Sequence, residues 1–126
     1  MVINVILLQE VNGVKFGTAR NEVRSALGDA TEFRKTQCSK TTTDDFGYCH
    51  VFYNEKDEFE AIEIFDYEDI IINGESVGSK SVESVMAMFD DAVEECGFIS
   101  SKYSVGVYAP DNNIESFLFG CKGYYD

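Results

Sequence analysis

The 126-residue sequence contains one proline, one histidine and no tryptophan, and only 10 lysines and arginines accompany 23 aspartates and glutamates. The scarcity of proline, together with 44% hydrophobic residues, excludes a largely disordered chain. The scarcity of basic residues leaves a net charge of −13, which repels the phosphates of nucleic acids and anionic lipids. We therefore expect a folded chain that binds neither nucleic acid nor membranes.

Long hydrophobic runs are also missing. No stretch approaches the roughly 20 apolar residues of a membrane-spanning helix. The apolar residues 1–8 are interrupted by Asn4, follow no basic residue and precede no small-residue cleavage site, so they predict a first strand rather than a signal peptide. The length is typical of one domain, and we expect a soluble, cytoplasmic, single-domain protein covering residues 1–126.

The four cysteines, Cys38, Cys49, Cys96 and Cys121, are widely spaced. No two of them form a Cys-x-x-Cys motif and His50 is the only histidine, so we expect no zinc site and no other cofactor. Two disulfides are arithmetically possible, but a chain of this length can bury enough apolar surface without them. We expect four reduced and mostly buried thiols.

Two helices are expected from apolar residues at helical spacing. In the first, Val23, Ala26 and Leu27 fall on one face. We expect it to begin at Thr18, a favoured N-cap residue, and to end before Gly28. The second is expected to begin after Ser79 or Ser81 and to end near Cys96, with Gly97 as its cap and with an apolar face formed by Val82, Val85, Met86, Phe89 and Val93.

Segments rich in β-branched and aromatic residues predict the strands. They are residues 1–8, 30–35, 46–53, 59–65, 70–72, 103–108 and 114–119. Four of these segments form two hairpins, 46–53 with 59–65 and 103–108 with 114–119. Residues 38–45 show no apolar periodicity and are expected to be a loop.

The two halves of the chain match each other. The hairpins align at an offset of 55 residues and the helices at an offset of 62, so that Val23 corresponds to Val85 and Leu27 to Phe89. We expect two degenerate helix-plus-hairpin repeats, repeat 1 over about 13–72 and repeat 2 over about 73–126. The fold class that follows is α+β, an antiparallel sheet of about six strands with both helices on one face.

The segment 13–28 resembles the opening of a known helix-plus-sheet module. In that pattern Gly17 and Gly28 bracket a helix that packs through Val23 and Leu27. The module occurs in β-lactamase-inhibitor-like proteins, in a small lipoprotein of outer-membrane assembly and in many immunity proteins. The usual proline after the second glycine is absent here, and so is a lipoprotein signal. The resemblance implies a tandem fold and a binding protein without catalytic activity.

Residues that could perform catalysis do not form a recognisable arrangement. Cys49 and His50 are neighbours on an expected strand, so their side chains point to opposite faces and cannot pair as nucleophile and base. Residues 111–113 predict a turn, because the ligand spacing of a calcium loop is missing. Glutamates that share a strand, such as Glu60 and Glu63, leave a hydrolase open, although such pairs are common in an acidic chain.

Acidic residues are concentrated in one segment. Residues 1–40 carry a net charge of +2 and residues 41–126 carry −15. Between Glu55 and Asp69, eight acidic residues accompany one lysine, with aromatic residues among them. Complementary charge raises association rates and aromatic side chains supply buried contact, so this segment predicts a surface for a basic protein. The expected contact residues are Glu58, Glu60, Asp66, Tyr67, Glu68 and Asp69.

The sequence therefore predicts a non-catalytic, immunity-type inhibitor that binds and neutralises a cationic toxin domain, most specifically a nuclease. Two alternatives are a small regulatory or ligand-binding module that uses the concave side of the sheet, and a hydrolase. A solvated acidic surface without a partner fits the same composition. Strands 70–72 and 117–119 could pair in a homodimer if they lay at a sheet edge.

Overall fold

Two β-sheets form most of the fold, in a computed structural model that describes residues 1–126. The five-stranded mixed sheet has the order β3–β2–β1–β8–β9, with β1 (Val2–Ile6), β2 (Glu10–Val11), β3 (Val14–Lys15), β8 (Asp69–Ile72) and β9 (Glu75–Ser76). The eight-stranded antiparallel sheet has the order β10–β11–β12–β13–β7–β6–β5–β4, with β4 (Thr31–Phe33), β5 (Thr43–Asp45), β6 (Cys49–Tyr53), β7 (Phe59–Ile64), β10 (Val93–Glu94), β11 (Gly97–Ser100), β12 (Val105–Tyr108) and β13 (Ser116–Gly120). The α+β class is confirmed, but the single sheet of about six strands is wrong.

The five-stranded sheet is centred on two strands that are far apart in the sequence. β1 pairs with β8 in parallel and places the buried residues Ile3 and Val5 opposite Ile70 and Ile72. The sequence predicts both strands but not their pairing, because an alternating pattern identifies a buried face and not a neighbouring strand. Both β8 and β13 lie inside their sheets, so neither offers a free edge to a second copy.

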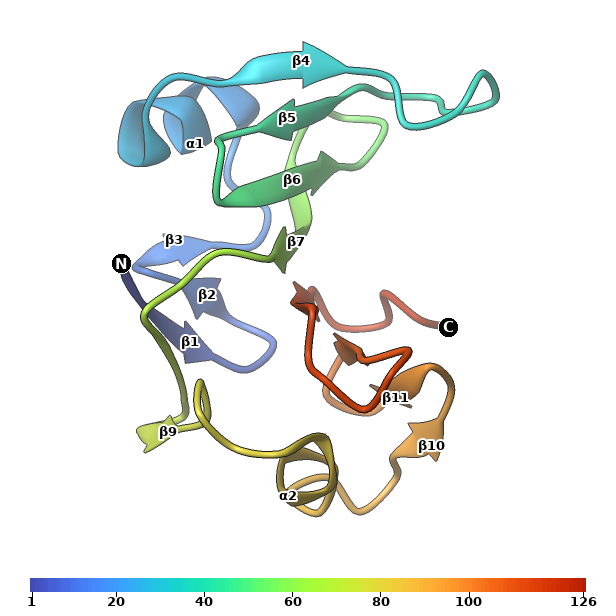
Figure 1. The fold of residues 1–126 in the computed structure, drawn as a ribbon. Helices are drawn as coiled ribbons and strands as arrows, with labels where there is room; N and C mark the ends of the chain where they lie inside the picture. The colour runs from blue at the N-terminus through green and yellow to red at the C-terminus, as the bar shows by residue number, and fades with distance from the viewer.

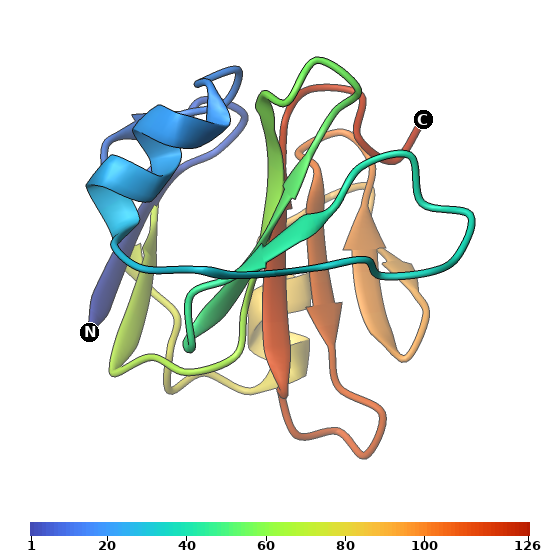
Figure 2. The ribbon, with the colours of Figure 1, turned by 90° about the horizontal axis from the view of Figure 1, so that it is seen from above.

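The eight-stranded sheet consists of two four-stranded meanders that meet at β7 and β13. The hairpins β6–β7 and β12–β13 confirm the two predicted hairpins. β7 and β13 then pair antiparallel and lie side by side (Figure 2). In this pairing Glu63 lies opposite Leu118 and Ile64 opposite Phe117. Three strands differ from the prediction: β5 lies in the expected loop 38–45, β10 lies in the expected second helix, and β11 follows it.

The core lies between the eight-stranded sheet and the elements on one side of it. In Figure 1 the five-stranded sheet, α1 (Arg20–Leu27) and α2 (Val82–Met86) lie on the same side, and the C-terminal tail 121–126 lies on the other. Alternate residues of the central strands point into the core, among them Ile62, Ile64, Phe117 and Phe119. Phe59 also lies in the core, beyond a register shift in the pairing of β7 with β6. The opposite face of this sheet has no helix over it (Figure 1).

Helix α1 confirms the first predicted helix with two corrections. Its N-cap residue is Ala19 and not Thr18, and no side chain caps it. Val23 is fully buried, but Ala26 is exposed, since the helix contacts the core through a narrower face than predicted. Gly28 ends the helix at φ 105°, a conformation that favours glycine.

Helix α2 is much shorter than predicted. It begins as expected after Ser81, whose hydroxyl accepts a hydrogen bond from the backbone of Ser84, but it ends at Met86 instead of near Cys96. Phe89 is buried as predicted, although it lies beyond the helix. Val93 is 65% exposed on β10 and not in the apolar face.

Contacts beyond α2 explain why the helix stops. The Asp91 carboxylate accepts hydrogen bonds from the Ser100 hydroxyl at 2.7 Å and from the backbone of Lys102 at 2.9 Å. These bonds hold the turn at Asp90 and Asp91 against the end of β11, and the chain then continues into β10. Gly97 is therefore the first residue of β11 and not a helix cap, and an added Cβ there would collide with the carbonyl oxygen of Val107.

Candidate functional site

The six predicted contact residues do not form one surface. Glu58 and Glu60 lie at the start of β7, whereas residues 66–69 lie beyond its far end, in the connection to β8. At about 3.3 Å per strand residue, the two groups are held roughly 15–20 Å apart. The continuous acidic segment of the sequence is therefore divided between the two ends of β7.

Asp69 stabilises the fold and is not a free carboxylate. It accepts hydrogen bonds from the backbone of Ile70 at 2.8 Å, from the backbone of Gly78 at 2.9 Å and from the Ser76 hydroxyl at 2.6 Å. The bond from Ser76, helped by those from the two backbone amides, lowers the pKa of Asp69 below its ordinary value. Asp69 thus fixes the β8–β9 hairpin.

The other residues of this connection differ in exposure. Tyr67 is half-buried, with its ring edge against Phe117 at 5.6 Å between centroids, and burial raises its pKa. The Tyr67 ring thus packs mainly against the core. Glu68 is exposed and pairs with the N-terminal amine of Met1 at 3.2 Å. Asp66 is exposed and forms no ion pair within the chain, so it is the carboxylate of this group that is free for a partner.

The two glutamates at the start of β7 are both partly buried. Glu58 accepts a hydrogen bond from the Asn54 side chain at 3.1 Å, within the turn that precedes β7. Glu60 lies close to the C-terminal tail: after burial, its carboxylate is the next cause that raises the pKa of both Cys121 and Tyr124. Glu60 therefore belongs to the same region of the surface as the tail.

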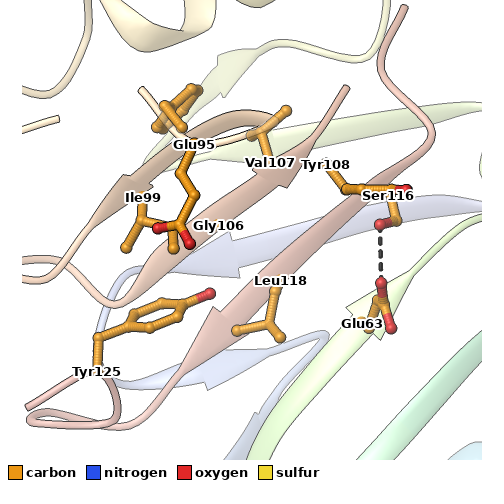
Figure 3. A pocket seen from close by; sticks show the side chains of 10 residues that line it. Glu63, Glu95, Ile99, Gly106, Val107, Tyr108, Ser116, Leu118 and Tyr125 are labelled. Atoms are coloured by element: carbon orange, nitrogen blue, oxygen red, sulfur yellow. Dashed lines mark hydrogen bonds between the residues drawn. The ribbon is translucent and has the colours of Figure 1, made fainter. Parts of the chain in front are cut away.

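A groove lies on the face of the eight-stranded sheet that no helix covers (Figure 3). It has a volume of about 180 Å³, and its lining comes from β7, β11, β12, β13, the turn before β11 and the C-terminal tail. Its principal lining residues are Glu63, Glu95, Ile99, Gly106, Leu118 and Tyr125. We call it the Glu63–Glu95 groove. No lysine or arginine lines it.

Polar groups of the groove are only partly engaged. One oxygen of Glu63 accepts a hydrogen bond from the Ser116 hydroxyl at 2.8 Å (Figure 3). The Tyr125 hydroxyl lies over Gly106, where an added Cβ would collide with it. Burial, followed by the proximity of Tyr124, Glu63 and Glu95, raises the pKa of Tyr125 to about 12. The groove is therefore an environment of negative potential.

A second group of charged side chains is buried beneath α1. The Asp44 carboxylate, which has no exposed side-chain surface, bonds to Arg24 at 2.6 and 2.8 Å and to the Tyr53 hydroxyl at 2.8 Å. Arg20 lies 3.5 Å from the same carboxylate and over the Tyr53 ring. Glu32 and Asp57 pair with the same two arginines from the exposed side. Because these ion pairs hold α1 against β5 and β6, the cluster is structural.

Cys49 and His50, the one candidate nucleophile–base pair of the sequence, are not brought together. Cys49 is buried while the neighbouring His50 lies on the other face of β6, between the rings of Phe33 at 5.1 Å and Phe65 at 5.0 Å. The chain has no group of three or more His, Cys, Asp or Glu side chains placed to hold a metal ion. None of its helices is long and apolar enough to cross a membrane.

No protein-family model, no curated protein and no solved structure matches this chain.

The different exposure of the four cysteine side chains can be tested directly by chemical labelling. Only Cys49 is fully buried, so the expectation of mostly buried thiols is wrong: Cys38 and Cys96 are exposed and Cys121 is intermediate. Burial raises the pKa of Cys49 to about 12. In the folded protein at mildly alkaline pH, we expect a thiol reagent to modify Cys38 and Cys96 quickly, Cys121 slowly and Cys49 only after unfolding.

Peptide mass spectrometry at successive times measures these rates residue by residue. An unlabelled portion of the protein, denatured without reductant, should have the intact mass of a chain with four free thiols. Rapid labelling of Cys49, or a mass deficit from a disulfide, would contradict the prediction.

Proposed function

We propose that this chain is a non-catalytic, immunity-type inhibitor that binds and neutralises a basic toxin domain, and that a nuclease is the most suitable target. The observation that carries the proposal is that many basic side chains are paired within the chain, whereas nearly all carboxylates reach the surface. Half of the basic side chains are engaged in ion pairs within the chain: Arg20, Arg24, Lys40, Lys80 and Lys102. Among the carboxylates only Asp44 is fully buried.

The consequence is an acidic surface on which only the other half of the basic side chains remain unpaired. A nuclease presents lysine and arginine to phosphate, so an acidic protein can occupy the same surface by offering carboxylates. The charge also accelerates association, which matters for an inhibitor that must act before its target does. The proposal needs no catalytic group in this chain.

The order of elements supports a tandem architecture, as in the inhibitors that segment 13–28 resembles. β2, a turn at Asn12-Gly13, β3 and α1 precede one four-stranded meander, while β8, a turn at Asn73-Gly74, β9 and α2 precede the other. Both turns have positive φ at the Asn and at the Gly. We propose that these halves are degenerate repeats, in which β8 belongs with the second.

The partner can be sought beside the gene for this chain. We expect a neighbouring gene to encode a toxin whose basic domain arrests growth when it is expressed alone, and we expect co-expression of this chain to restore growth. The purified basic domain should form a stoichiometric complex with this chain. An acidic partner, or growth arrest that this chain does not relieve, would overturn the proposal.

Charge reversal tests whether the predicted acidic residues steer the encounter. Glu60→Lys with Asp66→Lys should slow association with the basic domain by about tenfold and weaken its dependence on salt. Neither residue forms an ion pair in the chain, and Asp69 is left unchanged because it stabilises the β8–β9 hairpin.

The matched control is Glu22→Lys with Asp29→Lys, two exposed residues at α1, which changes the net charge equally. Stopped-flow measurements at low and high salt give both rates. Equal slowing in the two double variants would show that the association rate depends only on the overall net charge, and that Glu60 and Asp66 do not lie at the contact surface.

A further inference from the structure

The size of the Glu63–Glu95 groove limits what it can hold. Its volume of about 180 Å³ is smaller than the roughly 300–1,000 Å³ of pockets that take cofactors or drug-sized ligands. The groove is open to solvent. No helix lies on that side of the sheet (Figure 1). These dimensions suit one long side chain of a bound protein rather than a free small molecule.

The chemistry of the groove selects a cation with an apolar stem. Ile99 and Leu118 provide apolar surface from β11 and β13. In Figure 3 the Glu95 carboxylate and the Tyr125 ring approach Gly106 from opposite sides, and Leu118 lies between Tyr125 and Glu63. Since no basic residue lines the groove, its two carboxylates are left without a cationic partner.

An arginine matches these features better than a lysine. Its guanidinium is planar, can stack on the ring of a tyrosine and can donate two parallel hydrogen bonds to one carboxylate. The side chain of Tyr125 is fixed for such stacking because it lies over Gly106, the one residue of β12 whose missing Cβ makes room for it.

We propose that the Glu63–Glu95 groove binds an arginine side chain of the basic partner protein. The inference rests on the proposed function and adds the anchor point: the arginine stem lies on Leu118 and its guanidinium lies between Glu95 and Tyr125. The occupant is a basic protein and not a second copy of this chain, because each copy carries a net charge of −13 and two copies would repel.

The experiment uses the full chain, labelled with ¹⁵N, and titrates it with N-acetyl-arginine amide while amide chemical shifts are recorded. N-acetyl-citrulline amide, which has nearly the same shape without the charge, is the control ligand. We expect the arginine probe to shift Gly106, Leu118 and Tyr125 in a saturable way, with millimolar affinity, and the citrulline probe to leave them unchanged.

Two variants and one matched control locate the site. Glu95→Gln should weaken binding of the arginine probe about fivefold. Gly106→Ala should abolish the saturable shifts, since the new Cβ displaces Tyr125 from the groove. Glu94→Gln removes an equal charge from the adjacent residue and should leave the affinity unchanged. Thermal unfolding of each variant establishes that it is folded.

Each result has a distinct meaning. Shifts that do not saturate, that lie outside the groove, or that citrulline reproduces would overturn the arginine site while leaving growth rescue, and so the proposed function, unaffected. Equal weakening by Glu95→Gln and Glu94→Gln would also overturn it, because only a diffuse negative field would then act. Concentration-dependent dimerisation that Gly106→Ala abolishes would assign the groove to a second copy and overturn the proposed occupant.

Discussion

Replacing Asp44 with Asn should lower the free energy of unfolding by about 3–5 kcal/mol, the range for removal of one partner from a buried ion pair. The loss is large because Asp44 is the one fully buried carboxylate beside Arg20, whose side chain is 10% exposed. The other partners of Arg20, Asp57 at 3.0 Å and Glu32 at 3.8 Å, are exposed and screened by water. Arg24 and the Tyr53 hydroxyl would lose bonds of 2.6–2.8 Å to the same carboxylate. Urea unfolding at neutral pH, followed by circular dichroism, measures the difference.

Asp45→Asn is the matched control, since Asp45 is the next residue of β5 but is part-exposed and lies 3.7 Å from His50. We expect it to change stability by less than about 1 kcal/mol. A similar loss in both variants would mean that the Asp44 cluster contributes nothing special.

The pH dependence of Asp44 has a definite sign. Burial alone would raise the pKa of its carboxyl, but hydrogen bonds from Arg24 and Tyr53 outweigh burial and lower it below the ordinary value. A carboxyl with a lowered pKa in the folded state stabilises the fold above its unfolded pKa of about 3.9, and this contribution is lost as the pH falls through the folded pKa. The difference between wild type and Asp44→Asn should therefore shrink below about pH 4.

The same cluster shows where sequence patterns stop being informative. The two hairpins follow from alternating apolar residues and from turn residues, and both are found. β5, with the sequence Thr43-Asp44-Asp45, has no such pattern, because it is buried through ion pairs with α1 instead of through apolar side chains. A polar strand of this kind is predictable only once its partners in another element are known.

Most of the groove could not be predicted from the sequence either. Glu63 belongs to the acidic segment, but Glu95 and Tyr125 are brought to it by the pairing of β7 with β13 and by the return of the C-terminal tail over the sheet. The pairing of β7 with β13 has no local signal. One signal was present in the sequence: Gly106 interrupts the strand Val105–Tyr108, and a glycine inside a strand marks a close approach of another group. Here that group is Tyr125.

Leu27 and Phe89 correspond to each other in the alignment of the two predicted helices, but their surroundings in the structure differ. Phe89 is 5% exposed and packs against Phe98 at 5.7 Å and Tyr103 at 5.8 Å between ring centroids. Leu27 is only partly buried at the end of α1. Both side chains contact the core, so the predicted direction of each is confirmed, but they do not contribute equally.

Phe89→Ala should therefore lower the free energy of unfolding by about 3–5 kcal/mol, whereas Leu27→Ala should lower it by about 1–2 kcal/mol. The larger value combines lost apolar burial with a cavity beside Phe98 that cannot collapse, because β11 is held on both sides by β10 and β12. Leu27 borders solvent, so its truncation leaves no closed cavity. Ala26→Ser at the exposed neighbour of Leu27 is the control and should change stability by less than about 0.5 kcal/mol. If Phe89→Ala cost as little as this control, residue 89 would not be a core position, and the packing of the chain beyond α2 against β11 would be wrong.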